Sequence, residues 1–133
     1  MGHPEAAEWL RFAKNDLDSA VFLLGVKPRQ LEIICYHAQQ CAEKALKSLL
    51  VLKDVEIPRT HDLKHLVSHV TTLGFDVGSL LIELAGLQPY AVAVRYPFEL
   101  DLEAGDEDTA LQFASKIYDT CHKLSLDFPG SLM

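Results

Sequence analysis

The sequence predicts an all-α protein: an antiparallel up-and-down four-helix bundle with one extra short helix. Apolar residues recur at three- and four-residue steps through most of the 133-residue chain, which is the spacing of one helix face. Gly25, Pro28 and Gly74 separate these periodic segments, and no two segments alternate as partner strands would. Short connections favour antiparallel neighbours. The length suits a single domain, residues 1–133, that buries its own core.

Two long helices are expected in the first half of the chain. Pro4 suits a first helical turn and Gly25 a C-terminal stop, so they bound the first helix. Its apolar stripe comprises Ala6, Leu10, Ala13, Leu17, Ala20 and Leu24. The second helix follows Pro28 and keeps its pattern for more than six turns. Its stripe comprises Leu31, Ile34, Ala38, Cys41, Ala45, Leu49 and Leu52.

The middle of the chain predicts a short third helix and an interrupted fourth one. Thr60 would cap the third helix, Asp62 would complement its positive end, and Gly74 follows its last apolar residue. The fourth helix is expected from Asp76 through residue 94, with a kink or break at Pro89, which lacks an amide hydrogen. Its tail, "AVAV", also fits a strand.

The last helix opens on the acidic residues 106–108, which favour the positive end of a helix. Its apolar positions are Ala110, Phe113, Ala114, Ile117, Cys121 and Leu124. The three cysteines, Cys35, Cys41 and Cys121, lie among apolar helical positions without CxxC spacing. We therefore expect buried, reduced thiols.

Composition and charge exclude several classes of function. A net charge of −7 and a pI near 5.2 argue against sequence-blind attraction to phosphate backbones, so nucleic-acid chemistry would need a local site. No apolar run approaches the roughly 20 residues that cross a bilayer, and the N-terminus is acidic, unlike a signal peptide. We expect a cytoplasmic protein without membrane contact. Motifs of the P-loop, GxSxG and HExxH types are absent.

The second helix carries a polar face beside its apolar stripe. Within "CYHAQQCAEKALKSLL", the polar residues within a turn of one another are His37, Gln40, Lys44 and Lys47. Two interpretations are open. The face is a solvated helix flank, or its side chains hydrogen-bond a base, a phosphate or a second subunit.

Other polar groups are expected to lie on the surface. His61, His65 and His69 recur every four residues, a spacing that can present imidazoles to one metal ion, but no carboxylate or cysteine completes the set. We therefore predict a polar helix face and no metal or other cofactor. Acidic groups such as Asp16 with Asp18, and residues 106–108, lack a companion base and are expected to be surface acids.

Arg95 interrupts the apolar run "YAVAVRYP". A cation at a helix end meets unpaired carbonyls, and Pro97 forces Tyr96 toward an extended conformation, so Arg95 suits a helix terminus. Yet Tyr90 and Tyr96 frame this guanidinium with two phenols. A planar fork of donors suits phosphate, and the rings suit stacking on a base. The residues leave both roles open.

Four ordered blocks carry a resemblance to a known family. "WLRFAKNDLDSA", "CYHAQQCAEKALKSLL", "THDLKHLV" and "YAVAVRYP" resemble the HEPN domain family of small helical prokaryotic proteins, from about Ala6 to Leu124. The resemblance implies a helical bundle that usually dimerises. It also implies a minimal nucleotidyltransferase as partner, because many members form toxin–antitoxin pairs with one.

Numerous members of that family are metal-independent endoribonucleases whose arginine is followed four to six residues later by histidine. Arg95 matches the arginine, but Glu99, Leu100 and Asp101 stand where the histidine would be. Two functions are therefore expected: a partner-binding homodimer that also binds a nucleotide or RNA phosphate, or an endoribonuclease with a histidine from elsewhere, His37 or His61. The binding residues would be Arg95, Tyr96, Tyr90, His37, Gln40, Lys44 and His61, with Arg95 and His37 as the catalytic pair.

Overall fold

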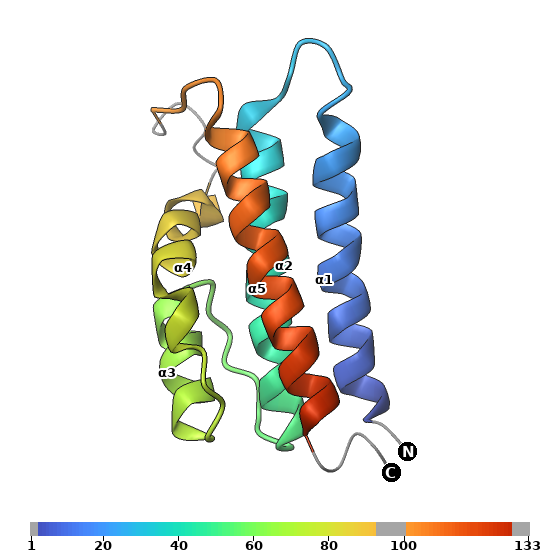
Figure 1. The fold of residues 1–133 in the computed structure, drawn as a ribbon, viewed down its shortest axis with the longest axis vertical. Coiled ribbons are helices and arrows are strands. Elements are labelled where there is room, and N and C mark those ends of the chain that lie inside the picture. Colours follow the sequence, from blue (N-terminus) through green and yellow to red (C-terminus); the bar gives the residue numbers. More distant parts are fainter. Residues whose placement is uncertain (1–2, 93–100, 129–133) are drawn as a thin grey trace.

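A computed structural model of the chain describes residues 3–92 and 101–128, and every regular element within these ranges is helical (Figure 1). The all-α class is therefore confirmed. Three long helices, α1 (Pro4–Leu23), α2 (Leu31–Leu52) and α5 (Asp106–Asp127), lie side by side. The shorter α3 (Leu63–Thr72) and α4 (Leu81–Leu87) lie along one flank of them. From their N-terminal to their C-terminal ends, α1 and α4 run antiparallel to α2 and α5 (Figure 1).

The ends of α1 follow from its terminal residues, as expected. Pro4 occupies the first turn, where its missing amide hydrogen costs no hydrogen bond. The side chain of His3 precedes it and accepts a hydrogen bond from the Ala6 amide at 3.3 Å. The helix ends at Leu23, two residues before Gly25. Both predicted boundaries are confirmed.

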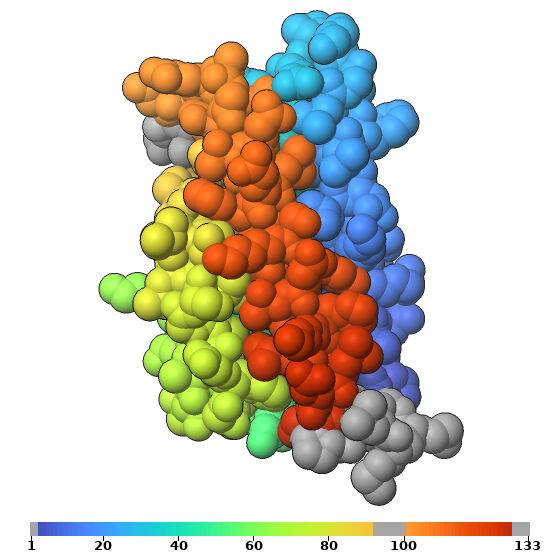
Figure 2. All heavy atoms as spheres, viewed as in Figure 1, coloured from blue at the N-terminus to red at the C-terminus, as the bar shows by residue number. Residues whose placement is uncertain are grey.

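Helix α2 lies at the centre of the bundle. It packs against α1 and α5 most extensively, and also against α3, α4 and the 3₁₀ segment Gln88–Val92. In the space-filling view, α5 and the α3–α4 pair cover most of α2 (Figure 2). Because neighbours surround it, α2 buries polar residues as well as its apolar stripe. The buried polar residues of α2 are Gln39, Gln40, Glu43, Lys47 and Ser48.

The predicted third helix is confirmed, but its cap differs from the one expected. The side chain of Asp62 is the N-cap and accepts from the Lys64 amide at 3.0 Å. The Thr60 hydroxyl oxygen instead accepts from the Asp62 amide at 3.1 Å. Thr60 therefore positions the capping residue and does not cap the helix itself.

The predicted fourth helix is broken into three shorter pieces. A 3₁₀ turn, η1 (Gly78–Leu80), precedes α4, and a second, η2 (Gln88–Val92), follows it. The change to η2 falls beside Pro89, which cannot donate to a carbonyl one turn earlier. Helix α4 is consequently seven residues long rather than a long helix. Residues 93 and 94 of the "AVAV" segment lie outside the described residues.

Glycine lets α4 approach α5 closely. A Cβ atom added at Gly86 would lie 2.5 Å from a ring carbon of Phe113, which is closer than atoms pack in proteins. No helix in the described ranges has both the length and the hydropathy that a membrane-spanning segment requires.

All three cysteines are buried and unpaired, as predicted. Burial disfavours the thiolate, which raises the pKa of Cys35 and of Cys121 to about 12 and raises that of Cys41 as well. The thiolate is the reactive form of cysteine. These side chains therefore act as small apolar core residues.

Candidate functional site

His37 and Lys44 of α2 meet at one carboxylate of α1. Nδ1 of His37 lies 2.9 Å from Oδ1 of Asp16, and Nζ of Lys44 lies 2.6 Å from Oδ2 of the same residue. Only 11% of the Asp16 side chain is exposed. The expectation that Asp16 is a surface acid is therefore wrong. Asp16 lies three residues after Ala13 and four before Ala20, which places it on the helix face that packs against α2.

The charge state of Asp16 determines how His37 is presented. Burial opposes ionisation, but hydrogen bonds from His37 and Lys44 outweigh it and hold the Asp16 pKa below its usual range. An ionised carboxylate only accepts, so Nδ1 of His37 carries a proton and Nε2 of the neutral ring keeps its lone pair. An imidazole held this way has the geometry of a proton carrier.

The His37 ring borders an open surface hollow, which we call the α1–α2 hollow. It is lined by Asn15, Asp18, Ser19, Phe22, Leu23 and His37. The Phe22 side chain is 77% exposed, so its ring is free to stack on a planar ligand. An imidazole oriented by a carboxylate and an exposed aromatic ring therefore share one hollow.

A second carboxylate is held by the same pair of residue types. Oε1 of Glu43 lies 2.9 Å from Nδ1 of His61, and its Oε2 lies 2.9 Å from Nζ of Lys47. The Glu43 and Lys47 side chains are only 4% and 10% exposed, whereas that of His61 is 60% exposed. The Lys47 ammonium also lies 5.8 Å from the ring centroid of Trp9. Glu43 thus anchors the segment before α3 to α2.

The polar face of α2 is not the solvated flank that one interpretation expected. Gln40 and Lys47 are buried, and Gln40 donates to the side-chain oxygen of Gln39 at 2.7 Å. Gln39 in turn donates to the His61 carbonyl at 3.3 Å. Only His37 and Lys44 are half-buried and border solvent. Half of this face therefore stabilises the fold from within.

The residues around Arg95 are only partly described. Arg95 and Tyr96 lie outside the described residues, so their predicted roles stay predictions. Tyr90 packs against the core beside Cys35, and its burial and hydrogen bond to that thiol raise its pKa to about 12. Cys35 and His37 are two residues apart and so lie on opposite sides of α2. Tyr90 and His37 therefore do not meet.

The three regularly spaced histidines separate into two groups. His61 precedes α3 and turns to Glu43, whereas Nε2 of His65 and Nε2 of His69 lie 2.9 Å apart on α3. Within the described ranges, no three or more His, Cys, Asp or Glu side chains are placed to hold a metal ion.

The acidic group at residues 106–108 is also only partly at the surface. Glu107 is buried, and its Oε2 lies 3.0 Å from Nη1 of Arg29. Its Oε1 accepts from the Gly105 amide at 2.7 Å. The surface expectation is therefore wrong for Glu107, which ties the loop before α2 to the start of α5.

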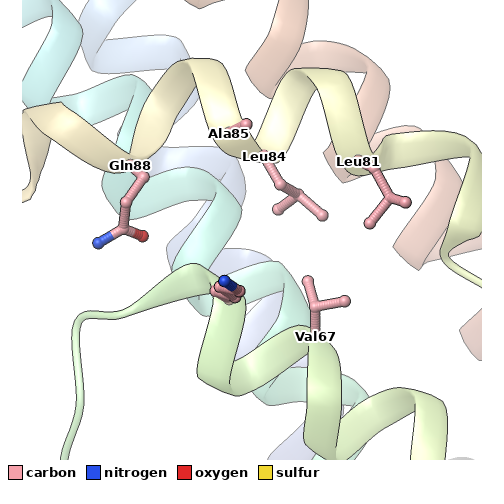
Figure 3. A pocket seen from close by; sticks show the side chains of 6 residues that line it. Val67, Leu81, Leu84, Ala85 and Gln88 are labelled. Carbon is pink, nitrogen blue, oxygen red and sulfur yellow. The ribbon is translucent and has the colours of Figure 1, made fainter.

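An apolar groove of about 390 Å³ separates α3 from α4 (Figure 3). It is lined by Lys64, Val67, Leu81, Leu84, Ala85 and Gln88. The Gln88 side-chain oxygen already accepts from the Leu63 amide at 2.7 Å. Lys64 is the only charged residue among those that line this groove. The groove is therefore better suited to bind an apolar surface of a partner than to act as a catalytic centre.

The architecture and the sequence blocks agree with one family. A family model described as "HEPN domain" matches residues 6–124, and the chain belongs to this family. The resemblance drawn from the four blocks is therefore confirmed.

Two solved structures share the fold. The crystal structure of ST0689, an archaeal HEPN homologue, is 26% identical and covers 90% of this chain and 97% of its own, with a TM-score of 0.68. TT1696 from Thermus thermophilus is 25% identical and covers 89% of this chain and 96% of its own, with a TM-score of 0.75. No curated protein matches the chain significantly.

Proposed function

We propose that the protein is the HEPN component of a toxin–antitoxin-type pair. In this role it is a homodimeric helical module that binds a minimal nucleotidyltransferase partner, with Arg95 offering a site for a nucleotide or RNA phosphate. The observation that carries the proposal is the family match over residues 6–124 in a chain with Glu99, Leu100 and Asp101 where the nucleolytic histidine would stand. The net charge of −7 also favours protein contacts over general nucleic-acid binding.

Two separate apolar surfaces support contacts with two different proteins. One lies at the end of α1 and its following turn, where Val21, Phe22 and Val26 are exposed. The other lies on α4 and includes Leu81 and Ile82, beside the α3–α4 groove. Exposed apolar patches of this kind mark interaction sites. A second copy and a nucleotidyltransferase would each need such a surface.

Light scattering of the purified protein is expected to give about twice the chain mass of 14.8 kDa. Co-expression with a minimal nucleotidyltransferase is expected to yield a stable complex. Phe22→Asp and Ile82→Asp form a matched pair, since both side chains are 77% exposed and neither change should unfold the protein. One variant should disrupt the dimer and the other the complex. A monomer that retains no nucleotidyltransferase contradicts the proposal.

A second candidate function is metal-independent RNA cleavage, which the geometry of His37 favours. Asp16 orients its ring, His37 lines the α1–α2 hollow, and the exposed Phe22 ring is free to stack on a base. In this function Arg95 steadies the phosphate while His37 transfers the proton of the ribose hydroxyl. His61, held by Glu43 and largely exposed, is the alternative proton carrier.

Cleavage of single-stranded RNA in excess chelator tests this second function. Arg95→Ala is expected to abolish cutting, and loss of the proton carrier is expected to slow it about 10²–10⁴-fold. His37→Gln and His61→Gln, compared with the exposed control His122→Gln, identify which imidazole acts. Equal cutting by the wild type and Arg95→Ala rules the function out.

A further inference from the structure

Two histidines on α3 take no part in either proposed function. His65 and His69 are four residues apart, so their side chains lie one above the other on the same helix face. Their ring centroids are 4.7 Å apart, and their Nε2 atoms are 2.9 Å apart. His65 is exposed and His69 is half-buried, so solvent reaches the pair.

The separation of the two nitrogens is short enough for both to reach one metal ion. The bond from an imidazole nitrogen to a divalent transition-metal ion such as Zn²⁺ is about 2.0–2.1 Å long. Two nitrogens 2.9 Å apart would therefore subtend an angle of about 90° at an ion that both of them bind. Neighbouring ligands of a tetrahedral ion would need a nitrogen separation of about 3.3 Å. A right angle belongs to octahedral or square-planar coordination, which Ni²⁺ and Cu²⁺ adopt with nitrogen and oxygen ligands.

We propose that His65 and His69 chelate one divalent transition-metal ion through their Nε2 atoms, and that they take Cu²⁺ or Ni²⁺ in preference to Zn²⁺. Water fills the other positions, because no third protein ligand faces the pair within the described residues. His61 contributes nothing, since it precedes α3 and its Nδ1 contacts Glu43.

The proton balance of binding follows from the hydrogen bond between the two rings. In the metal-free neutral pair, one Nε2 donates its proton to the other at 2.9 Å. To bind the ion, the donor ring gives up this Nε2 proton and takes one up at its own Nδ1, so both Nε2 atoms offer a lone pair and the neutral pair releases no net proton. A protonated imidazole has no lone pair at Nε2, so binding weakens as the pH falls. An open site with two protein ligands binds its ion reversibly.

Calorimetric titration of the full chain with Cu²⁺, Ni²⁺ and Zn²⁺ in turn tests the site. All variants are made in a His3→Gln background, which removes the histidine nearest the amino terminus as a competing ligand. One equivalent of Cu²⁺ or Ni²⁺ is expected to bind more tightly than Zn²⁺. His65→Gln and His69→Gln should each weaken binding more than about tenfold, the loss that even outer partners of a metal ligand typically cause. His122→Gln should change nothing.

The electron paramagnetic resonance spectrum supplies a second measurement. The Cu²⁺-loaded protein is expected to show coupling to two imidazole nitrogens, and each of the two α3 variants should remove this signal. The proposal is overturned if the double variant His65→Gln with His69→Gln binds the ion as tightly as the His3→Gln background. Tighter binding of Zn²⁺ than of Ni²⁺ or Cu²⁺ overturns the proposed metal preference. Both α3 substitutions are at the surface, so circular dichroism should stay unchanged.

Discussion

Replacing Glu43 by alanine is expected to lower the free energy of unfolding by about 3–5 kcal/mol. Glu43 is nearly completely buried and is the carboxylate that accepts hydrogen bonds from both Lys47 and His61. Removing it leaves the Lys47 ammonium buried without its counterion, which is far more costly than losing a surface ion pair. The segment before α3 also loses its anchor on α2.

Urea denaturation followed by circular dichroism measures this change. The double variant Glu43→Leu with Lys47→Leu provides the matched control, because it removes both charges and fills the space with apolar atoms. It should recover most of the lost stability. If the free energy of unfolding of Glu43→Ala is within about 0.5 kcal/mol of the wild-type value, the buried ion pair does not stabilise the fold and the prediction is wrong.

Replacing Asp16 by alanine is expected to lower the free energy of unfolding at pH 7 by about 2 kcal/mol, the scale of hydrogen bonds to charged groups. The substitution leaves Lys44 and His37 without their shared carboxylate. The Asp16 pKa is lower in the folded protein than in the unfolded chain, so its contribution is complete above the unfolded value of about 3.9. It is lost as the pH falls through the lower, folded value.

The difference between wild type and Asp16→Ala should therefore be constant near neutral pH and disappear in strong acid. Asp18→Ala is the control, because Asp18 is an exposed carboxylate that pairs with Lys14 at 3.2 Å on the same helix. It should change stability by less than about 0.5 kcal/mol. A stability difference for Asp16→Ala that grows as the pH falls would contradict the assigned ionisation.

Helix positions were predictable because helix periodicity is local. Alternating three- and four-residue steps predict α1, α2 and α5 within a few residues, since each pattern records which face meets a neighbour. The fourth predicted helix was less accurate. Apolar residues continue through Pro89, so the pattern extends farther than the α-helical hydrogen bonds do.

The candidate site was predictable only as a set of residues on one helix. Position along α2 placed His37, Gln40 and Lys44 near one another, but their partners come from distant parts of the chain. Asp16 is 21 residues from His37, and His61 is 18 residues from Glu43. Periodicity does not encode such pairs, which explains why Asp16 was expected at the surface and Glu43 went unnoticed.

The sequence by itself determined the all-helical class, the family and the extent of the long helices, because those depend on local spacing and on residue order. Only the tertiary structure decided which polar groups are buried. Helix α1 and the segment before α3 cover the polar face of α2, and burying its charges requires a partner for each one. Gln40 and Lys47 therefore hydrogen-bond to buried side chains of α2 itself, whereas His37 pairs with Asp16 and still borders the solvent.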